Sequence, residues 1–240
     1  MQLPSPLIDG ILLERENRYR ARVATALGEV LAFVPNPGRT LELLYPGARV
    51  VLGQAAPRPG PPRRTAYDLR LAYTRDGLLV SVDTRLAGPL FAEALAQGKI
   101  APLAGYVVDR AEVVYGASRL DFRLTAPDRP ACLVEVKSST LVEDGLARWP
   151  DSPSLRGQRH VRELARAAAE GYRVAVVWIV QRSDATRLSP HAGIDPAFAA
   201  ALAEVVGQGV EAYAYTCDVT RQTVEVAREI PVKLPPGLSC

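Results

Sequence analysis

The first third of the chain consists of short segments in which apolar and polar residues alternate. Residues 7–34 read LIDGILLERENRYRARVATALGEVLAFV, and a predicted turn at Gly28–Glu29 divides this stretch into strands. Further segments of this kind follow at residues 49–53, 67–73 and 78–82. Alternation with a period of two is typical of strands that bury one face. Five or six such strands in about eighty residues predict a small β-barrel or sandwich.

After Val82 the pattern changes to helical segments separated by strands. The helices are predicted at residues 88–98, 157–172 and 195–209, where Asp195 followed by Pro196 is a typical helix start. The continuous apolar run RVAVVWIVQ predicts a buried strand. The other strands are predicted at residues 106–116, 118–125, 131–141 and 210–219. This half therefore reads as an α/β domain, and we expect two domains, 1–82 and 83–240.

The composition is that of an ordinary soluble globular protein, with 48% hydrophobic and 23% charged residues. No apolar run approaches the length of a membrane span, and the N-terminus lacks the basic and apolar regions of a signal peptide. The three cysteines, Cys132, Cys217 and Cys240, are spaced too widely for a disulfide framework or a zinc site. We therefore expect a cytoplasmic protein that does not bind membranes.

The charge is distributed unevenly along the chain. Residues 1–80 contain 11 arginines and 7 acidic residues, a balance of +4, whereas the remaining 18 basic and 19 acidic residues give −1. The net charge of +3 is too small to indicate a nucleic-acid-binding protein by itself. The basic half contains the loop GQAAPRPGPPRRTA, in which Arg58, Arg63 and Arg64 are candidate contacts to phosphates. Aromatic side chains of such a barrel can stack on bases. The aromatics available here are Tyr19, Phe33, Tyr45, Tyr67 and Tyr73, and we expect most of them in the core.

Two consecutive strands place charged residues on one face. In SRLDFRL, Asp121 lies on the face opposite Leu120 and Phe122. In LVEVKSS, Glu135 and Lys137 lie on the face opposite Val134 and Val136. A hairpin through residues 126–130 would bring Asp121 close to Glu135. Two carboxylates at that distance repel each other unless a positive charge lies between them.

A hard divalent cation, Mg²⁺ or Mn²⁺, would supply that positive charge. The cation would be held by oxygen ligands from Asp121 and Glu135, and it would activate a water while Lys137 stabilises a phosphate. An aspartate followed one hairpin later by Glu-x-Lys is how a nuclease site of the PD-(D/E)XK type is built. The alternative is a surface ion pair between Glu135 and a neighbouring arginine, with Lys137 in solvent.

The predicted helix after this hairpin has one basic side. Arg156, Arg159, Arg162 and Arg166 lie on that side, and the apolar residues lie opposite and would pack on the sheet. Such a stripe beside a phosphodiester-cleaving site would hold a DNA backbone. The alternative is an ordinary solvated face, partly neutralised by Glu163 and Glu170.

Several segments resemble one protein family. The segments EVVYGASRLDFRL, CLVEVKSSTL and RGQRHVREL are similar to the sugar fermentation stimulation protein A (SfsA) family, as are VPNPG, YPGARVVL, GYRVAVVWIVQR and IDP. The resemblance runs in order from about residue 15 to residue 230. It implies an N-terminal OB-like β-barrel, followed by a PD-(D/E)XK nuclease-like α/β domain with a mixed central sheet.

The resemblance also assigns site residues. Asp121, Glu135 and Lys137 fall on the core motif, and a further acid is expected, with Glu93 as first choice and Glu112 as second. Gln158 and His160 open the helix after the site, where related nucleases place a polar residue facing the metal. The alternatives are an exposed position for Glu93 and a role at the helix start for Gln158 and His160. The family usually has His or Cys before the Pro-Asn of its first motif, where this chain has Val34.

The sequence therefore predicts a DNA-binding protein of the SfsA type with a divalent-metal-dependent nuclease site. Two alternatives stay open: a DNA-binding regulator of sugar metabolism that keeps the nuclease fold without catalysis, and a scaffold protein with neither activity. No organic cofactor is expected, because Gly207-Gln208-Gly209 follows a helix and leads into a strand, the reverse of a dinucleotide-binding motif. The sequence leaves open the oligomeric state and the choice between single and double strands.

Overall fold

A computed structural model describes residues 1–56 and 63–234, so the predictions for Arg58 and Cys240 lie outside the described residues. The chain divides into two compact units. Unit 1 comprises Met1–Leu86 together with Asp218–Glu225, and unit 2 comprises Ala87–Cys217 and the chain from Val226 onward. The first unit extends beyond the predicted boundary at residue 82, and no local sequence pattern indicates that residues 218–225 belong to it.

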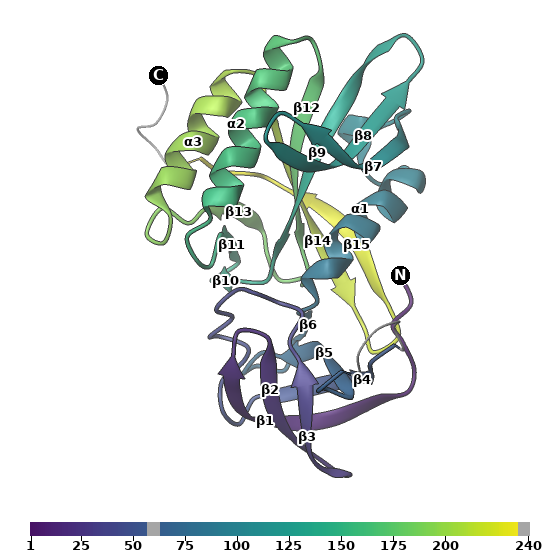
Figure 1. The fold of residues 1–240 in the computed structure, drawn as a ribbon, viewed down its shortest axis with the longest axis vertical. Coiled ribbons are helices and arrows are strands. Elements are labelled where there is room, and N and C mark those ends of the chain that lie inside the picture. Colours follow the sequence, from purple (N-terminus) through teal and green to yellow (C-terminus); the bar gives the residue numbers. More distant parts are fainter. Residues whose placement is uncertain (57–62, 235–240) are drawn as a thin grey trace. The chain divides into compact units, whose positions relative to one another are not determined.

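Unit 1 is a closed five-stranded barrel of OB topology, as predicted (Figure 1). The strands follow the order β3-β2-β1-β4-β5, and a parallel pairing of β3 with β5 closes the barrel, while the short β6 extends it. The turn between the second and third strands is at residues 26–27, two residues before the predicted position, and Gly28 opens the third strand with a φ of 99°. The strands are β1 (Leu7–Asn17), β2 (Arg20–Thr25), β3 (Gly28–Phe33), β4 (Arg49–Gln54), β5 (Tyr67–Tyr73) and β6 (Leu79–Ser81).

The alternating residues of these strands form the barrel core. Leu12, Val23, Ala32 and Leu52 are among the side chains with no exposed surface. Val34 belongs to the same core, so the position before Pro35-Asn36 contributes apolar packing in this chain.

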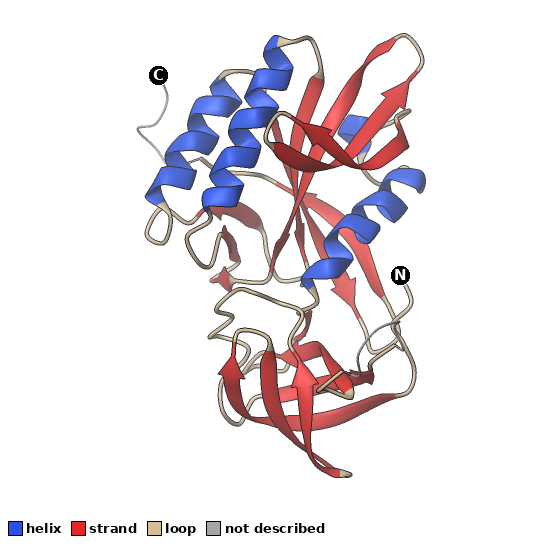
Figure 2. Cartoon of the chain, viewed as in Figure 1, coloured by secondary structure: helices blue, strands red, loops and turns tan. Residues whose placement is uncertain are grey.

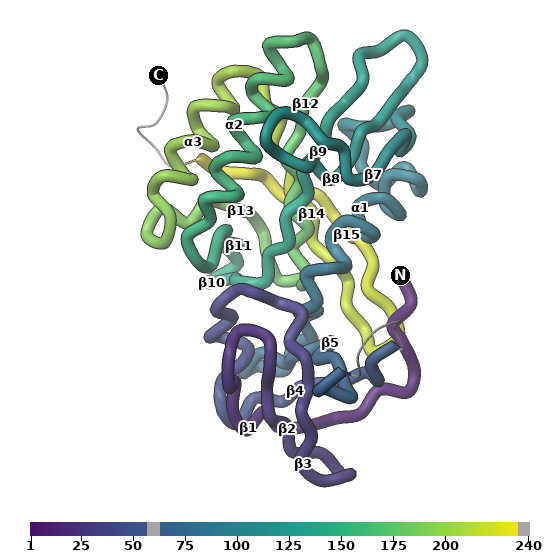
Figure 3. The backbone as a smooth tube through the Cα atoms, viewed as in Figure 1, coloured from purple at the N-terminus to yellow at the C-terminus, as the bar shows by residue number. Residues whose placement is uncertain are grey.

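Unit 2 is built on a mixed six-stranded sheet, the architecture predicted from the sequence. Its order is β15-β14-β12-β9-β8-β7, with antiparallel pairing from β7 to β9 and parallel pairing from β9 through β12 to β14. Figure 3 traces the crossover through α2 that joins the parallel neighbours β9 and β12. The strands are β7 (Val107–Tyr115), β8 (Ser118–Ala126), β9 (Arg129–Ser139), β12 (Arg173–Val180), β14 (Glu211–Val219) and β15 (Val224–Ile230).

Helices cover both faces of this sheet (Figure 2). The helix α2 (Leu155–Ala169) buries Val161 and Leu164 against alternate residues of β12, and α3 (Pro196–Gly207) joins the same core. The helix α1 (Ala87–Ala96) lies on the other face, where the rings of Phe91 and Phe122 are 5.3 Å apart. Two short 3₁₀ helices flank it, at Thr84–Leu86 and Ala101–Leu103.

A second, three-stranded sheet was not predicted. It consists of β10 (Val142–Glu143), β11 (Leu146–Trp149) and β13 (Arg187–Pro190). Segments of two to four residues are too short to show a period, which explains why the sequence did not indicate them. In the described part of the chain, no helix combines the length and the hydrophobicity needed to cross a membrane.

Candidate metal and phosphate site

The hairpin of β8 and β9 brings Asp121 and Glu135 together. Phe122 pairs with Val134 in the antiparallel register, so Asp121 and Glu135, the next residues along the two strands, point to the opposite face and act on each other electrostatically. That face is the one covered by α2. The Asp121 carboxylate also accepts a 2.7 Å hydrogen bond from the main-chain N–H of Val136, which fixes its position against the neighbouring strand.

Glu135 uses only one of its two oxygens for contacts with the protein. Its Oε1 binds the Lys137 ammonium at 2.5 Å and also contacts Nδ1 of His160. Its Oε2 is buried and has no hydrogen-bond partner among the described residues. A buried carboxylate oxygen without a partner is costly in a low-dielectric interior. This oxygen is therefore a candidate ligand for a cation.

The two carboxylates have opposite pKa shifts. Burial and the negative charge of Glu135 raise the pKa of Asp121 to about 6, although the hydrogen bond from Val136 opposes this rise. Burial also raises the pKa of Glu135, but the Lys137 ammonium and His160 outweigh it and hold that pKa below its usual value. At neutral pH Glu135 is fully charged, and Asp121 is close to the range in which it takes up a proton.

His160 connects this pair to the outer side of α2. The histidine is 1% exposed, and its Nε2 accepts a 3.2 Å hydrogen bond from Nε of Arg156. Because the arginine Nε–H can only donate, Nε2 carries no proton and Nδ1 carries the proton that it donates to Glu135. The sequence placed His160 at the start of this helix, but its contact with Glu135 was not predicted.

The surface-ion-pair interpretation of Glu135 and Lys137 is wrong. Both residues are buried, with 3% and 8% of their surface exposed, and they bind each other. The Lys137 ammonium also lies 5.4 Å from the ring centre of Trp149 and 3.5 Å from Nδ1 of His160. The lysine is therefore held inside the site and does not extend into solvent.

Gln158, Glu93 and Glu112 lie in other surroundings. Gln158 is buried, and its amide donates a 2.9 Å hydrogen bond to Asp195, the N-cap of α3. Glu93 is half-buried on α1, which packs on the opposite face of the sheet. Glu112 is exposed on β7 and forms a 3.4 Å ion pair with Arg119.

The donor set fits a hard divalent cation with few protein ligands. Within residues 1–56 and 63–234, no three His, Cys, Asp or Glu side chains gather in a metal-ligating arrangement. The cation Mg²⁺ needs no such cage, because it keeps several waters and takes one or two carboxylates plus substrate phosphates. Asp121 and the unpartnered Oε2 of Glu135 would be those two carboxylates.

The four arginines predicted on α2 are all exposed: Arg156, Arg159, Arg162 and Arg166. Glu163, which we expected to neutralise this stripe from the surface, is 6% exposed and packs beneath Gly116 in the turn between β7 and β8. Only Arg166 contacts Glu163, at 3.3 Å. Glu163 therefore still neutralises part of the stripe, through Arg166.

The two barrel arginines have different environments. Arg63 is mostly covered and forms a 2.5 Å ion pair with the buried Asp68, so its guanidinium is engaged within unit 1. Arg64 is exposed. Of these two candidates for phosphate contacts, Arg64 presents its charge to solvent.

Two family models match the chain in order. A model described as the SfsA N-terminal OB domain matches residues 13–82. A model described as the sugar fermentation stimulation protein RE domain matches residues 85–223. Together the two matches cover most of both units.

Similar proteins align over nearly the whole chain. A sugar fermentation stimulation protein homolog of Moorella thermoacetica is 45% identical, covering 98% of this chain and 100% of the relative. The homolog of Symbiobacterium thermophilum is 48% identical, with 92% and 93% coverage. Among solved structures, Pyrococcus furiosus SfsA in complex with Ca²⁺ matches with a TM-score of 0.87 and 30% identity, over 97% of this chain and 98% of the other.

Proposed function

Because the chain belongs to the sugar fermentation stimulation protein (SfsA) family, we propose that it binds DNA and hydrolyses phosphodiester bonds at the site formed by Asp121, Glu135 and Lys137. The observation that carries this proposal is the buried, unpartnered Oε2 of Glu135 opposite Asp121. Two converging carboxylates beside a buried ammonium are the groups that phosphodiester hydrolysis assisted by a divalent cation requires.

Each residue has a distinct role in this proposal. Asp121 and Glu135 would hold the cation, which when bound supplies Lewis acidity and an activated water. The Lys137 ammonium keeps Glu135 ionised. It also places a positive charge near the phosphate. The exposed arginines of α2 hold the DNA backbone beside the site.

The relative from Pyrococcus furiosus supports the cation in this proposal. That protein is described in complex with Ca²⁺, and Ca²⁺ takes only oxygen ligands. The cations Mg²⁺ and Mn²⁺ prefer carboxylate and water ligands as well. A site of this chemistry in this chain would therefore bind Mg²⁺ or Mn²⁺.

A second candidate function is DNA binding without catalysis, as expected of a regulator that keeps the nuclease fold. It is favoured by the 2.5 Å ion pair that engages the Lys137 ammonium with Glu135. An ammonium held this way must leave part of that contact before it can reach a phosphate.

The deciding experiment uses labelled single-stranded and double-stranded DNA with EDTA, Mg²⁺ or Mn²⁺. The wild type is compared with Asp121→Asn and Glu135→Gln, which keep the shape of each side chain but remove its charge. We expect cleavage that requires the cation and falls roughly 100-fold or more in either variant. Cleavage that persists in both variants contradicts the proposed site, and binding without cleavage in every cation leaves the non-catalytic function.

A further inference from the structure

A pair of aromatic rings, one exposed and one half-buried, lies on the outside of the barrel. Phe33 ends β3 between Ala32 and Val34, which are both fully buried, so its ring points away from the core. Tyr19, in the turn between β1 and β2, is 48% exposed. The two rings are stacked, with centres 6.1 Å apart and planes inclined by 13°. Stacking on Phe33 covers part of the Tyr19 ring, and the exposed remainder of that ring can receive a third ring.

A network of arginines borders these rings. The guanidiniums of Arg63 and Arg85 lie 5.5 and 5.6 Å from the centre of the Phe33 ring. Both arginines bind Asp68, and Arg85 and Arg70 also bind Asp83. Three guanidiniums share two carboxylates, which leaves one positive charge in excess. Because the Arg85 side chain is 48% exposed, part of that charge reaches the surface.

Arg15 brings two more arginines to the same end of the barrel. Its guanidinium donates to the main-chain carbonyls of Arg18 and Arg39 at 2.9 and 2.5 Å, and to those of Asn36 and Gly38 at 2.9 and 2.8 Å. The side chains of Arg18 and Arg39 are exposed. Arg64 follows Arg63 in the chain and is exposed as well. Four exposed arginines, Arg18, Arg39, Arg64 and Arg85, are therefore linked to this end of the barrel by contact or by chain adjacency.

We propose that this surface binds single-stranded nucleic acid, with a base stacked on Tyr19 and phosphates held by the arginines. The surface, which we call the barrel platform, is defined by Arg18, Tyr19, Phe33, Arg39, Arg64 and Arg85. The inference rests on the proposed DNA binding and specifies the form of DNA. A single strand can turn a base face toward a protein ring, whereas a duplex hides those faces between its own base pairs.

The position of the platform in the fold agrees with this ligand. Tyr19 lies in the turn between β1 and β2, and Arg64 lies in the loop between β4 and β5. These two loops, together with the face of the second and third strands, are where OB barrels bind oligonucleotides.

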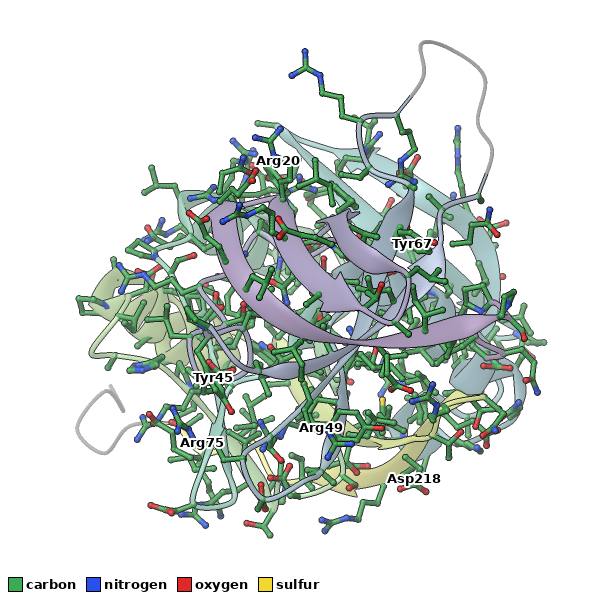
Figure 4. All side chains as sticks on the ribbon, turned by 90° about the horizontal axis from the view of Figure 1, so that it is seen from below. Arg20, Tyr45, Arg49, Tyr67, Arg75 and Asp218 are labelled. Carbon is green, nitrogen blue, oxygen red and sulfur yellow. The ribbon has the colours of Figure 1, made fainter. Side chains whose placement is uncertain are left out.

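Two tyrosine rings elsewhere on the barrel are each covered by an arginine. Arg49 lies 4.3 Å from the Tyr73 ring centre, and Arg75 lies 4.4 Å from that of Tyr45, a pair labelled in Figure 4. A guanidinium this close covers one face of the ring. None of the guanidinium–ring contacts within the described residues involves Tyr19. Tyr19 therefore offers the more accessible ring.

The test measures binding of a labelled oligo(dT) strand, and of a duplex of the same length, by fluorescence anisotropy in EDTA. We expect Tyr19→Ala to weaken single-strand binding about 5- to 100-fold, because stacking on the ring is lost, and to leave duplex binding unchanged. Tyr19→Phe keeps the ring and should bind like the wild type. Leu27→Ala removes an apolar side chain of 71% exposure outside the platform and serves as the matched control.

A second variant tests the arginines of the platform. Arg64→Ala should weaken single-strand binding and reduce its dependence on salt by the equivalent of about one phosphate contact. Wild-type single-strand affinity in Tyr19→Ala, or a wild type that binds only duplex, overturns the inference and leaves the proposed function standing. A wild type that binds neither form of DNA overturns the proposed function as well.

Discussion

The two oxygens of the Glu135 carboxylate have different surroundings. Lys137 and His160 both bind Oε1, so this oxygen is satisfied within the protein. The same contacts hold the carboxylate in one orientation and leave Oε2 without a partner among the described residues. Residues that orient a metal ligand often affect metal affinity almost as much as the ligand itself does. We therefore predict that His160 positions Glu135 for the proposed cation.

The first prediction at this scale concerns His160. We expect His160→Ala to lower the affinity for Mn²⁺ by about 10- to 100-fold, because Glu135 loses the donor that fixes its orientation. His160→Asn should retain most of the affinity, since its amide N–H can replace Nδ1–H. Isothermal titration calorimetry measures both variants, and circular dichroism checks that each is folded. Equal affinities for wild type and His160→Ala would rule out the positioning role.

A second prediction concerns the buried Asp68 in the barrel. Burial raises the pKa of Asp68, but hydrogen bonds from Arg85 and Arg63 and the charge of Arg70 outweigh it and hold that pKa below its usual value of 3.8. A carboxyl group whose pKa is lowered on folding stabilises the protein above its unfolded pKa. That stabilisation is lost as the pH falls below about 4, through the folded pKa.

Asp68→Asn should therefore lower the free energy of unfolding by roughly 3 kcal/mol at pH 7, because three arginines lose a buried partner. The difference from wild type should shrink in acid below pH 4. Urea unfolding at both pH values measures it, and Asp128→Asn, in the exposed turn between β8 and β9, is the control. A difference that does not depend on pH would refute the electrostatic explanation.

At the scale of elements, one carboxylate joins the starts of two helices. Asp195 caps α3 by accepting a 2.9 Å hydrogen bond from the N–H of Phe198. It also accepts a 2.8 Å hydrogen bond from the N–H of Ser154, the N-cap of α2, and a 2.9 Å bond from the amide of Gln158. The segment that carries His160 to Glu135 is thus fixed at its first turn.

Asp195→Ala should lower the free energy of unfolding by about 3 kcal/mol, because three donors lose their acceptor at a position that is 3% exposed. Ser154→Ala removes only the side-chain cap of α2, a 3.0 Å bond from Gly157, and should cost about 1 kcal/mol. Urea denaturation compares the two. Similar losses in both variants would mean that Asp195 acts only as an ordinary helix cap.

At the scale of the whole molecule, unit 1 is not one continuous piece of chain. Residues 218–225 belong to it, and they pair with its N-terminus. The N–H of Leu3 donates to Gln222 at 2.7 Å, the N–H of Val224 donates to Met1 at 3.0 Å, and Arg221 forms a 2.5 Å ion pair with Asp9. The barrel itself closes through β3 and β5 without this segment.

A fragment of residues 1–86 should therefore fold as a barrel but lose the order of its first residues. We expect the amide of Leu3 to exchange rapidly with solvent in the fragment and to be protected in the full chain, because its acceptor is absent from the fragment. Hydrogen exchange followed by mass spectrometry measures this. Equal protection in both proteins would show that residues 218–225 contribute nothing to the N-terminus.

The sequence by itself determined the features that depend on a local period or a local cap. Alternation along β8 and β9 is enough to place Asp121, Glu135 and Lys137 on one face, because the side-chain period of a strand does not depend on its neighbours. Likewise, Asp195 followed by Pro196 is enough to start α3. The barrel and the mixed sheet follow from such local patterns together with the family resemblance.

Only the tertiary structure decided which of these groups meet. His160 contacts Glu135 across 25 residues of chain, and Gln158 contacts Asp195 across 37. Glu163 is buried because Gly116 leaves room for it, and Arg63 is engaged because Asp68 lies beneath it. These contacts depend on how separate elements pack, and packing is fixed by the shape of the whole core rather than by the spacing of residues along one element.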